Sequence, residues 1–223
     1  MVILSVPVVP SLKFSALLPL ARTLAARDKA TFQHAKRVRR YATALALRVG
    51  IVDIEARRLV EAAALFHDVG KLAIPTRLLA RPGPLTPVEY EHVKRHAAIG
   101  ADLLAGLSFP ADLSRLVRHH HEHWDGSGYP DRLRRDDIPA GARALAIADC
   151  YDALTSDRPY RRAVSHATAI SMISDRCGSM FDPEMVEAFL QLAVGFWPAA
   201  ADPRGVNLSP NLQARVAIAT GAR

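Results

Sequence analysis

Apolar residues recur along this chain at the three- and four-residue spacing that is typical of amphipathic α-helices. No stretch shows a convincing alternation of apolar and polar residues, which is the pattern of a half-buried β-strand. Residues 86–89 (TPVE) form a capping-box pattern with proline at the first helical position. The spacing predicts an all-α protein with helices over residues 31–49, 54–66, 87–104, 110–121, 142–154, 167–176 and 183–196.

Glycine, proline and aspartate interrupt this pattern and indicate where the helical domain ends. They gather between residues 124 and 139, where we expect a loop, and again after residue 197, where we expect a poorly structured tail. We therefore expect an N-terminal extension over residues 1–20, one helical domain over residues 21–196 and a C-terminal tail over residues 197–223.

The composition limits the classes of protein that remain. The 223 residues are 50% hydrophobic and 23% charged, as in a soluble globular protein, and the net charge of +7 favours anionic partners. With an aromatic content of 6%, we expect surfaces that stack single-stranded bases to be sparse. Cys150 and Cys177 are not in a CxxC arrangement, which excludes a zinc ribbon and a thioredoxin-type redox site. Pro7 and Pro10 interrupt the apolar N-terminus, so we expect a cytoplasmic protein without membrane segments.

Five of the nine histidines fall on helix faces that should be buried. On the first predicted helix, His34 shares an apolar stripe with Val38 and Leu45. A single histidine in such a place is usually a hydrogen-bonded core residue, because an unpaired polar group is costly in a core. Five histidines accompanied by two aspartates are hard to explain in that way. The set is His34, His67, Asp68, His96, His120, His121 and Asp149.

The chemistry of these side chains points to a metal centre. Histidine with carboxylate and without thiolate is a donor set that suits Mn, Fe, Zn or Ni rather than Mg or Ca. Seven donors are more than one ion needs, so the pattern predicts two metal ions. Two neighbouring ions suit the hydrolysis of phosphate esters, because they can bridge a hydroxide and stabilise the in-line displacement.

Four groups of residues resemble the motifs of the HD-GYP family, a branch of the HD-domain phosphohydrolases. Residues 67–71 (HDVGK) are similar to its HDxGK signature, and residues 120–130 (HHEHWDGSGYP) are similar to its HHExxDGxGYP signature. Residues 148–161 and the FDP sequence at 181–183 resemble the blocks that follow in that family. The similarity extends from about residue 25 to residue 190.

This resemblance implies a bacterial, all-helical HD-type bundle with an additional GYP loop and C-terminal helices. Characterised members hydrolyse cyclic di-GMP to pGpG, in some cases on to GMP, and commonly use iron or manganese. Carried over by motif, the metal ligands are the seven residues named above, and Asp68 bridges both ions. Members that bind a third metal carry a glutamate one turn before the first histidine. Ala30 occupies that position here, which predicts two ions.

The resemblance also assigns residues around the metals. It places Lys71 beside the phosphate, where the ammonium could stabilise charge or protonate the leaving 3′-oxygen. The alternative for Lys71 is pairing with the last carbonyls of a helix. It places Tyr129, Arg158 and Arg161 in contact with the substrate, since arginine binds phosphate or a guanine edge through paired hydrogen bonds. Tyr129 could equally pack as a turn residue beneath the loop, and we expect Arg37 to belong to an exposed basic surface.

The expected activity is therefore that of a cyclic di-GMP phosphodiesterase, as a monomer or a homodimer. The same centre could act on another cyclic dinucleotide or on a nucleotide monoester, although the GYP loop argues against the monoester. A catalytically weak module that binds a cyclic dinucleotide or a signalling partner protein is an alternative from another class, and loss of ligands would favour it. DNA binding is a further alternative that no recognition-helix signature supports. Few residues precede the first predicted helix, so we expect a stand-alone catalytic domain.

Overall fold

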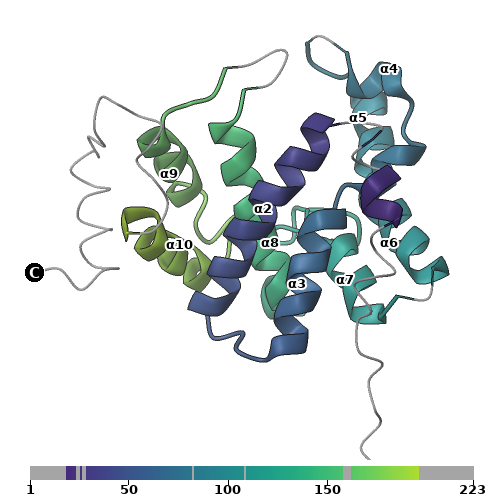
Figure 1. Cartoon of the computed structure of the whole chain (residues 1–223). Coiled ribbons are helices and arrows are strands. Elements are labelled where there is room, and N and C mark those ends of the chain that lie inside the picture. Colours follow the sequence, from purple (N-terminus) through teal and green to yellow (C-terminus); the bar gives the residue numbers. More distant parts are fainter. Residues whose placement is uncertain are drawn as a thin grey trace, which may run out of the picture.

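The computed structural model describes residues 19–23, 26, 29–81, 83–107, 109–157 and 162–195 (Figure 1). Most of the expected N-terminal extension and the whole expected C-terminal tail lie outside these residues. The described helices and 3₁₀ turns, in chain order, are α2 (Lys29–Arg48), α3 (Ile54–Phe66), η1 (Val69–Ala73), α4 (Thr76–Leu79), α5 (Pro87–Lys94), α6 (His96–Gly106), α7 (Ala111–His119), η2 (Arg135–Asp137), α8 (Ala140–Thr155), α9 (His166–Ser174) and α10 (Pro183–Gly195).

The all-α prediction is confirmed. Among the described residues no β-strand forms, and a single isolated bridge joins Cys177 to Phe181. None of the helices in the described part of the chain combines the length and the apolar character that a membrane span requires.

Helix starts follow the local sequence signals closely. The Thr86 hydroxyl accepts from the backbone N–H of Glu89 at 3.3 Å, and the Glu89 carboxylate accepts from the backbone N–H of Thr86 at 2.9 Å. This reciprocal capping box confirms the predicted start of α5 at Pro87. Asp53 likewise caps α3 by accepting from the backbone N–H of Ala56 at 2.8 Å.

The single helix predicted over residues 87–104 is wrong in one respect, because the chain turns at Arg95 and divides it into α5 and α6. The Val93 carbonyl would accept from Ala97 in a continuous α-helix. Here it accepts from the backbone N–H of Arg95 and, at 2.7 Å, from Nδ1 of the His96 ring. The break therefore serves to orient a histidine. The helix expected over residues 110–121 also ends early, at His119.

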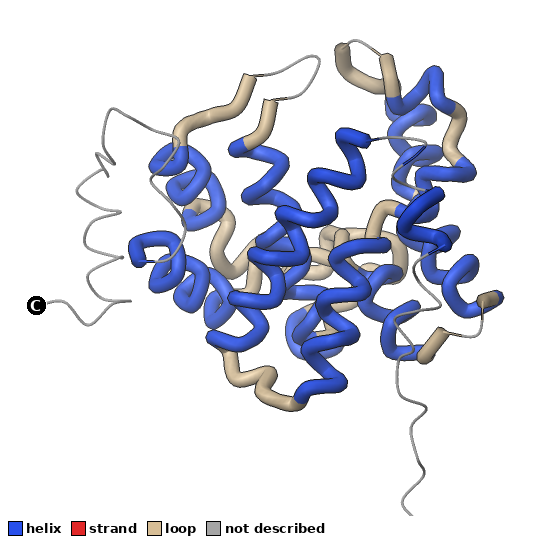
Figure 2. Tube along the Cα trace, viewed as in Figure 1, coloured by secondary structure: helices blue, strands red, loops and turns tan. Residues whose placement is uncertain are grey.

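Three helices form the centre of the bundle. Helix α2 packs against α3 and α8, while α9 and α10 cover one side of this group and α4 to α7 lie on the other (Figures 1 and 2). Leu45, Phe66, Leu145 and Phe189 are completely buried between these elements. Helix α6 contacts both α7 and η1, and α7 contacts α3. The packing thus brings together the ends of α3 and α7, the start of α6 and the middle of α8, where the predicted metal ligands stand.

Candidate metal centre

The seven predicted ligands converge from five helices. His34 comes from α2, His67 and Asp68 follow the last turn of α3, and His96 opens α6. The others are His120 and His121, just after α7, and Asp149, within α8. Within the described residues, two groups of three donors could each hold a metal ion, with the donor atoms of each group within 4.8 Å of one another. The fold therefore brings the predicted side chains close together.

The first group contains His34, His67 and Asp68. Nε2 of His34 lies 3.3 Å from Nε2 of His67. Asp149 joins this group, since its Oδ1 lies 3.2 Å from Nε2 of His34 and 3.8 Å from Nε2 of His67. Two imidazoles and two carboxylates therefore face one point.

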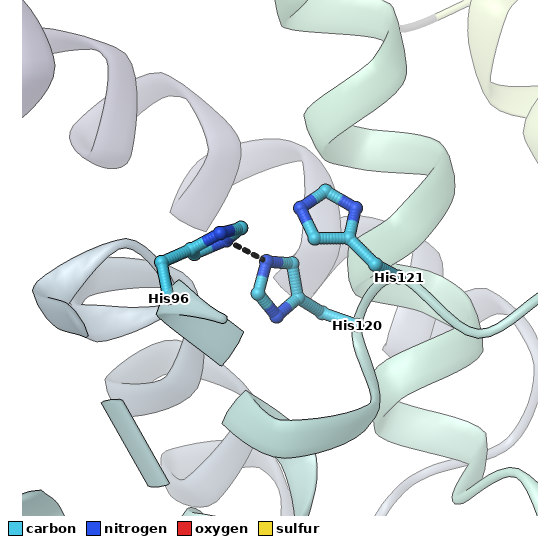
Figure 3. Close-up of side chains that lie close together, drawn as sticks. All are labelled: His96, His120 and His121. Carbon is cyan, nitrogen blue, oxygen red and sulfur yellow. Dashed lines mark hydrogen bonds between the residues drawn. The ribbon is translucent and has the colours of Figure 1, made fainter. Parts of the chain in front are cut away.

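The second group contains His96, His120 and His121 (Figure 3). Nε2 of His96 lies 3.4 Å from Nε2 of His120, and the rings of His120 and His121 are 4.0 Å apart. Consecutive residues of a helix point about 100° apart, so two neighbouring histidines within a helix would diverge. Because α7 ends at His119, His120 and His121 occupy a turn and both approach His96.

Asp68 lies between the two groups. Its Oδ2 is 3.4 Å from Nε2 of His67, and its Oδ1 is 3.5 Å from Nε2 of His96. Gly70 makes this approach possible, because a β-carbon at that position would come within 1.9 Å of the His96 carbonyl oxygen. A carboxylate with one oxygen toward each group has the arrangement required of a bridging ligand.

Hydrogen bonds to the far side of four of the five rings determine which nitrogen faces the cluster. A carbonyl oxygen can only accept, so Nδ1 of the ring must donate and Nε2 is left with its lone pair. Three of the histidines share this contact with the carbonyl three residues earlier. They are His67 with Ala64 at 2.9 Å, His96 with Val93 at 2.7 Å and His120 with Val117 at 2.6 Å.

Asp152 accepts a hydrogen bond from Nδ1 of His34 and so orients this ring as well. The sequence pattern did not identify Asp152. Its Oδ2 lies 2.7 Å from Nδ1 of His34, and the carboxylate also accepts two hydrogen bonds from Arg37, at 2.6 and 2.9 Å. Arg37 was expected on an exposed basic surface. Its side chain is 41% exposed, but its guanidinium pairs with a buried carboxylate. Asp152 stands three residues after Asp149, and Arg37 three after His34, so each pair shares a helix face.

Burial and charge set the protonation states of the cluster. Burial lowers the pKa of His121 to about 3 and holds the pKa of His120 well below its usual value. Although burial opposes it, Lys71 and His67 hold the pKa of Asp68 far below its usual range. Neutral imidazoles and an ionised carboxylate are the forms that bind a divalent cation. His34 differs, because hydrogen bonds to Asp149 and Asp152 outweigh burial and raise its pKa to about 9.

Lys71 stands at the edge of the cluster. Its ammonium lies 2.6 Å from Oδ2 of Asp68 and its side chain is 34% exposed. The Lys71 side chain therefore pairs with Asp68 rather than with the last carbonyls of a helix, which was the alternative. A cation thus sits beside the carboxylate that lies between the two groups.

The loop after α7 closes over the cluster. The ring of Tyr129 lies 4.9 Å from the ring of His121 at an angle of 31°, and its backbone N–H donates to the His121 carbonyl at 3.1 Å. Glu122 anchors the loop by accepting from the backbone N–H of Asp131 at 2.7 Å. Tyr129 therefore packs beneath the loop and also contacts the candidate centre. Arg158 and Arg161, the other predicted substrate contacts, lie outside the described residues.

The donor set could hold divalent metal ions. Five imidazoles and two carboxylates are present, outer hydrogen bonds orient four of the rings, and no thiolate belongs to either group. Most of these groups are buried. Burying an ionised carboxylate costs free energy unless a cation lies beside it.

Comparison with known proteins points the same way. The pattern of the HD domain family matches residues 19–185. The chain is 41% identical over 174 residues to the cyclic di-GMP phosphodiesterase response regulator RpfG of Xanthomonas campestris. The matched region covers 77% of this chain and 46% of that protein. It is 37% identical over 174 residues to the 3′3′-cGAMP-specific phosphodiesterase 2 of Vibrio cholerae, covering 77% of this chain and 33% of that protein. The chain thus spans less than half the length of either relative.

A solved structure shares the fold. Bd1817, a HDG"Y"P protein from Bdellovibrio bacteriovorus, superposes with a TM-score of 0.60 at 22% sequence identity, over 78% of this chain and 58% of that one. The family match over residues 19–185 agrees with the motifs that carried the resemblance and with the histidine groups that the fold assembles. The chain belongs to the HD domain family.

Proposed function

We propose that this protein is a phosphodiesterase that hydrolyses cyclic di-GMP with two divalent iron or manganese ions. The observation that carries the proposal is the position of Asp68, whose two oxygens face His67 at 3.4 Å and His96 at 3.5 Å. A site for one ion would need no carboxylate between two separate histidine groups. This arrangement supports a two-metal centre of the kind that cleaves phosphate esters.

The bound ions would supply a nucleophile derived from water and compensate charge on the phosphoryl oxygens. In this proposal, His34, His67 and Asp149 would hold one ion, and the second histidine group would hold the other. Asp68, whose carboxylate lies between the groups, would serve both sites.

Lys71 has the position of a charge-stabilising or proton-donating group. Its ammonium lies 2.6 Å from Asp68, and a third of its side chain is exposed to solvent. It can approach a phosphoryl group placed at the cluster, offset the developing negative charge, or give a proton to the 3′-oxygen as the P–O bond breaks. Tyr129, which packs on His121, would form a flat wall beside the substrate.

A second candidate substrate is 3′3′-cGAMP, because a relative named for that molecule matches at 37% identity. Both substrates carry the same pair of phosphodiester bonds, so the metal centre alone does not distinguish them. Arg158 and Arg161 are proposed to contact the substrate and are suited to read a guanine edge. The proximity of all seven predicted ligands disfavours the non-catalytic alternative.

Hydrolysis by the metal-loaded protein tests the proposal. Protein loaded anaerobically with Fe or Mn is incubated with cyclic di-GMP or with 3′3′-cGAMP, and the products are separated by chromatography. We expect cyclic di-GMP to yield pGpG, and the Asp68→Ala variant to be inactive. Asp112→Ala removes a carboxylate that is 66% exposed on α7, and should retain wild-type activity. Preferential cleavage of 3′3′-cGAMP would favour the second candidate, and cleavage of neither substrate with either metal would contradict the proposal.

A further inference from the structure

A pocket of about 460 Å³ lies beside the candidate centre, between α5 and the loop that follows α7. Its volume falls in the range of small-molecule binding sites. Helix α5 contributes Tyr90 and Lys94, Arg95 follows them, and the loop contributes Tyr129 and Arg132. None of these five residues belongs to the two donor groups.

The walls of the pocket combine flat and cationic surfaces. The Lys94 ammonium lies 5.3 Å from the centre of the Tyr90 ring and 5.4 Å from the centre of the Tyr129 ring. Both distances are typical of cation–π contacts, so the ammonium is held between the two tyrosines. It also pairs at 2.5 Å with Glu91, whose side chain is 66% exposed. An ammonium has three donors, and an exposed partner does not occupy all of them.

The charge of the lining favours an anion. Lys94, Arg95 and Arg132 contribute three positive charges against the one negative charge of Glu91. Tyr90 is 49% exposed, which leaves ring surface available to a ligand. Aromatic rings beside cations are the combination that binds a nucleobase together with its phosphate.

The pocket adjoins the metal cluster through shared residues. Tyr129 lines the pocket and also packs on His121, at 4.9 Å between ring centres. On the opposite wall, Arg95 immediately precedes His96, the first residue of α6. A ligand that reaches from the cluster along Tyr129 therefore enters the pocket.

A cyclic dinucleotide has two phosphates and two purines, and only one phosphodiester is cleaved at a time. The nucleotide that is not being cleaved needs its own cation and its own flat surface. We propose that the pocket between α5 and the loop binds this second nucleotide, with Lys94 against its phosphate and Tyr90 stacked on its purine. The inference rests on the proposed function and adds Tyr90 and Lys94 to the residues that contact the substrate.

Calorimetric binding tests the inference. The manganese-loaded full chain is titrated with the bisphosphorothioate analogue of cyclic di-GMP, which resists hydrolysis. Tyr90→Ala and Lys94→Ala should each weaken binding roughly tenfold, as loss of one stacking or charged contact does. Arg115→Ala removes a cation from a side chain that is 60% exposed on α7, and should bind as the wild type does. Thermal melting confirms that each variant is folded.

The outcomes separate this inference from the proposed function. If Tyr90→Ala and Lys94→Ala both bind the analogue like the wild type, the pocket is not a subsite. Absence of binding to the wild type would also overturn the inference. In either case, hydrolysis of bis(p-nitrophenyl) phosphate by the loaded wild type would show that the metal centre still works. Weakened binding in the variants of a protein that cleaves no diester would support the subsite and reject the proposed function.

Discussion

Nδ1 of His34 lies 2.7 Å from Oδ2 of Asp152, and the same ring places Nε2 3.2 Å from Asp149. The first contact fixes the ring so that the second nitrogen faces the cluster. Asp152 is only 1% exposed and is itself held by the guanidinium of Arg37. Asp152 and Arg37 therefore orient one candidate metal ligand, His34, from behind.

Replacing Asp152 should weaken the first metal position without removing a ligand. Asp152→Asn keeps the size of the side chain but loses the charge that pairs with Arg37 and orients His34. We expect the affinity for the ion at the His34 position to fall roughly ten- to hundredfold, as is usual for a lost outer contact of a metal-bound histidine. Competition with a colorimetric chelator measures this affinity. Asp112→Asn is the matched control, and an Asp152→Asn protein with wild-type affinity would reject the orienting role.

Gly70 should tolerate no side chain. A β-carbon there would lie 1.9 Å from the His96 carbonyl oxygen and 2.6 Å from the backbone nitrogen of Gly100. Relieving a clash with backbone atoms costs roughly 1–3 kcal/mol or more. Gly70→Ala should therefore lower the melting temperature by several degrees.

Gly106 provides the control for this substitution. It lies in α6, and a β-carbon there would meet nothing within 4 Å. Alanine is favoured over glycine inside a helix by roughly 0.5–1 kcal/mol. Gly106→Ala should thus melt at or slightly above the wild-type temperature, and equal melting of both variants would contradict the close approach of η1 to α6.

The main features of the fold and the centre were accessible from the sequence because they follow local rules. The capping box at Thr86 marks a helix start, and the apolar stripe of α2 identified His34 as a residue that faces inward. The turn at Arg95 was not predicted, because it depends on the His96 ring bonding to the Val93 carbonyl. The spacing of apolar residues along a helix gives no information about such a side-chain hydrogen bond.

Asp152 and Arg37 were not recognised for a related reason. Each lies on an amphipathic helix where a charged residue is usually solvated, and 115 residues separate them. Only the packing of α2 against α8 brings them together. The short elements η1, α4 and η2 were also not predicted, because stretches of three to five residues carry too few positions for a periodic pattern.

Asp131 should make the stability of the protein depend on acidic pH. Hydrogen bonds from Arg118, and further contact with His119, lower its pKa from 3.8 to about 2. A carboxyl group whose pKa is lowered by folding stabilises the fold above pH 3.8, and this contribution is lost as the pH falls toward 2. The difference in melting temperature between wild type and Asp131→Asn should therefore be largest above pH 4 and shrink toward pH 2. A difference in melting temperature that stays the same at every pH in this range would show that ionisation of Asp131 contributes no stability.

Arg158 should act mainly in substrate binding. If it contacts a phosphate or a guanine edge, that contact exists in the ground state and in the transition state alike. Arg158→Ala should then raise KM roughly tenfold and leave kcat nearly unchanged. Steady-state kinetics with cyclic di-GMP measures both constants. A fall in kcat with unchanged KM would assign Arg158 to the chemical step instead.

The metal content of the Asp68→Ala protein tests the bridging ligand most directly. Wild-type chain loaded anaerobically with manganese and then desalted should retain two ions per chain, measured by elemental analysis against protein concentration. Asp112→Ala should retain the same amount, and Asp68→Ala should lose most of it. Full metal content in Asp68→Ala would contradict the account.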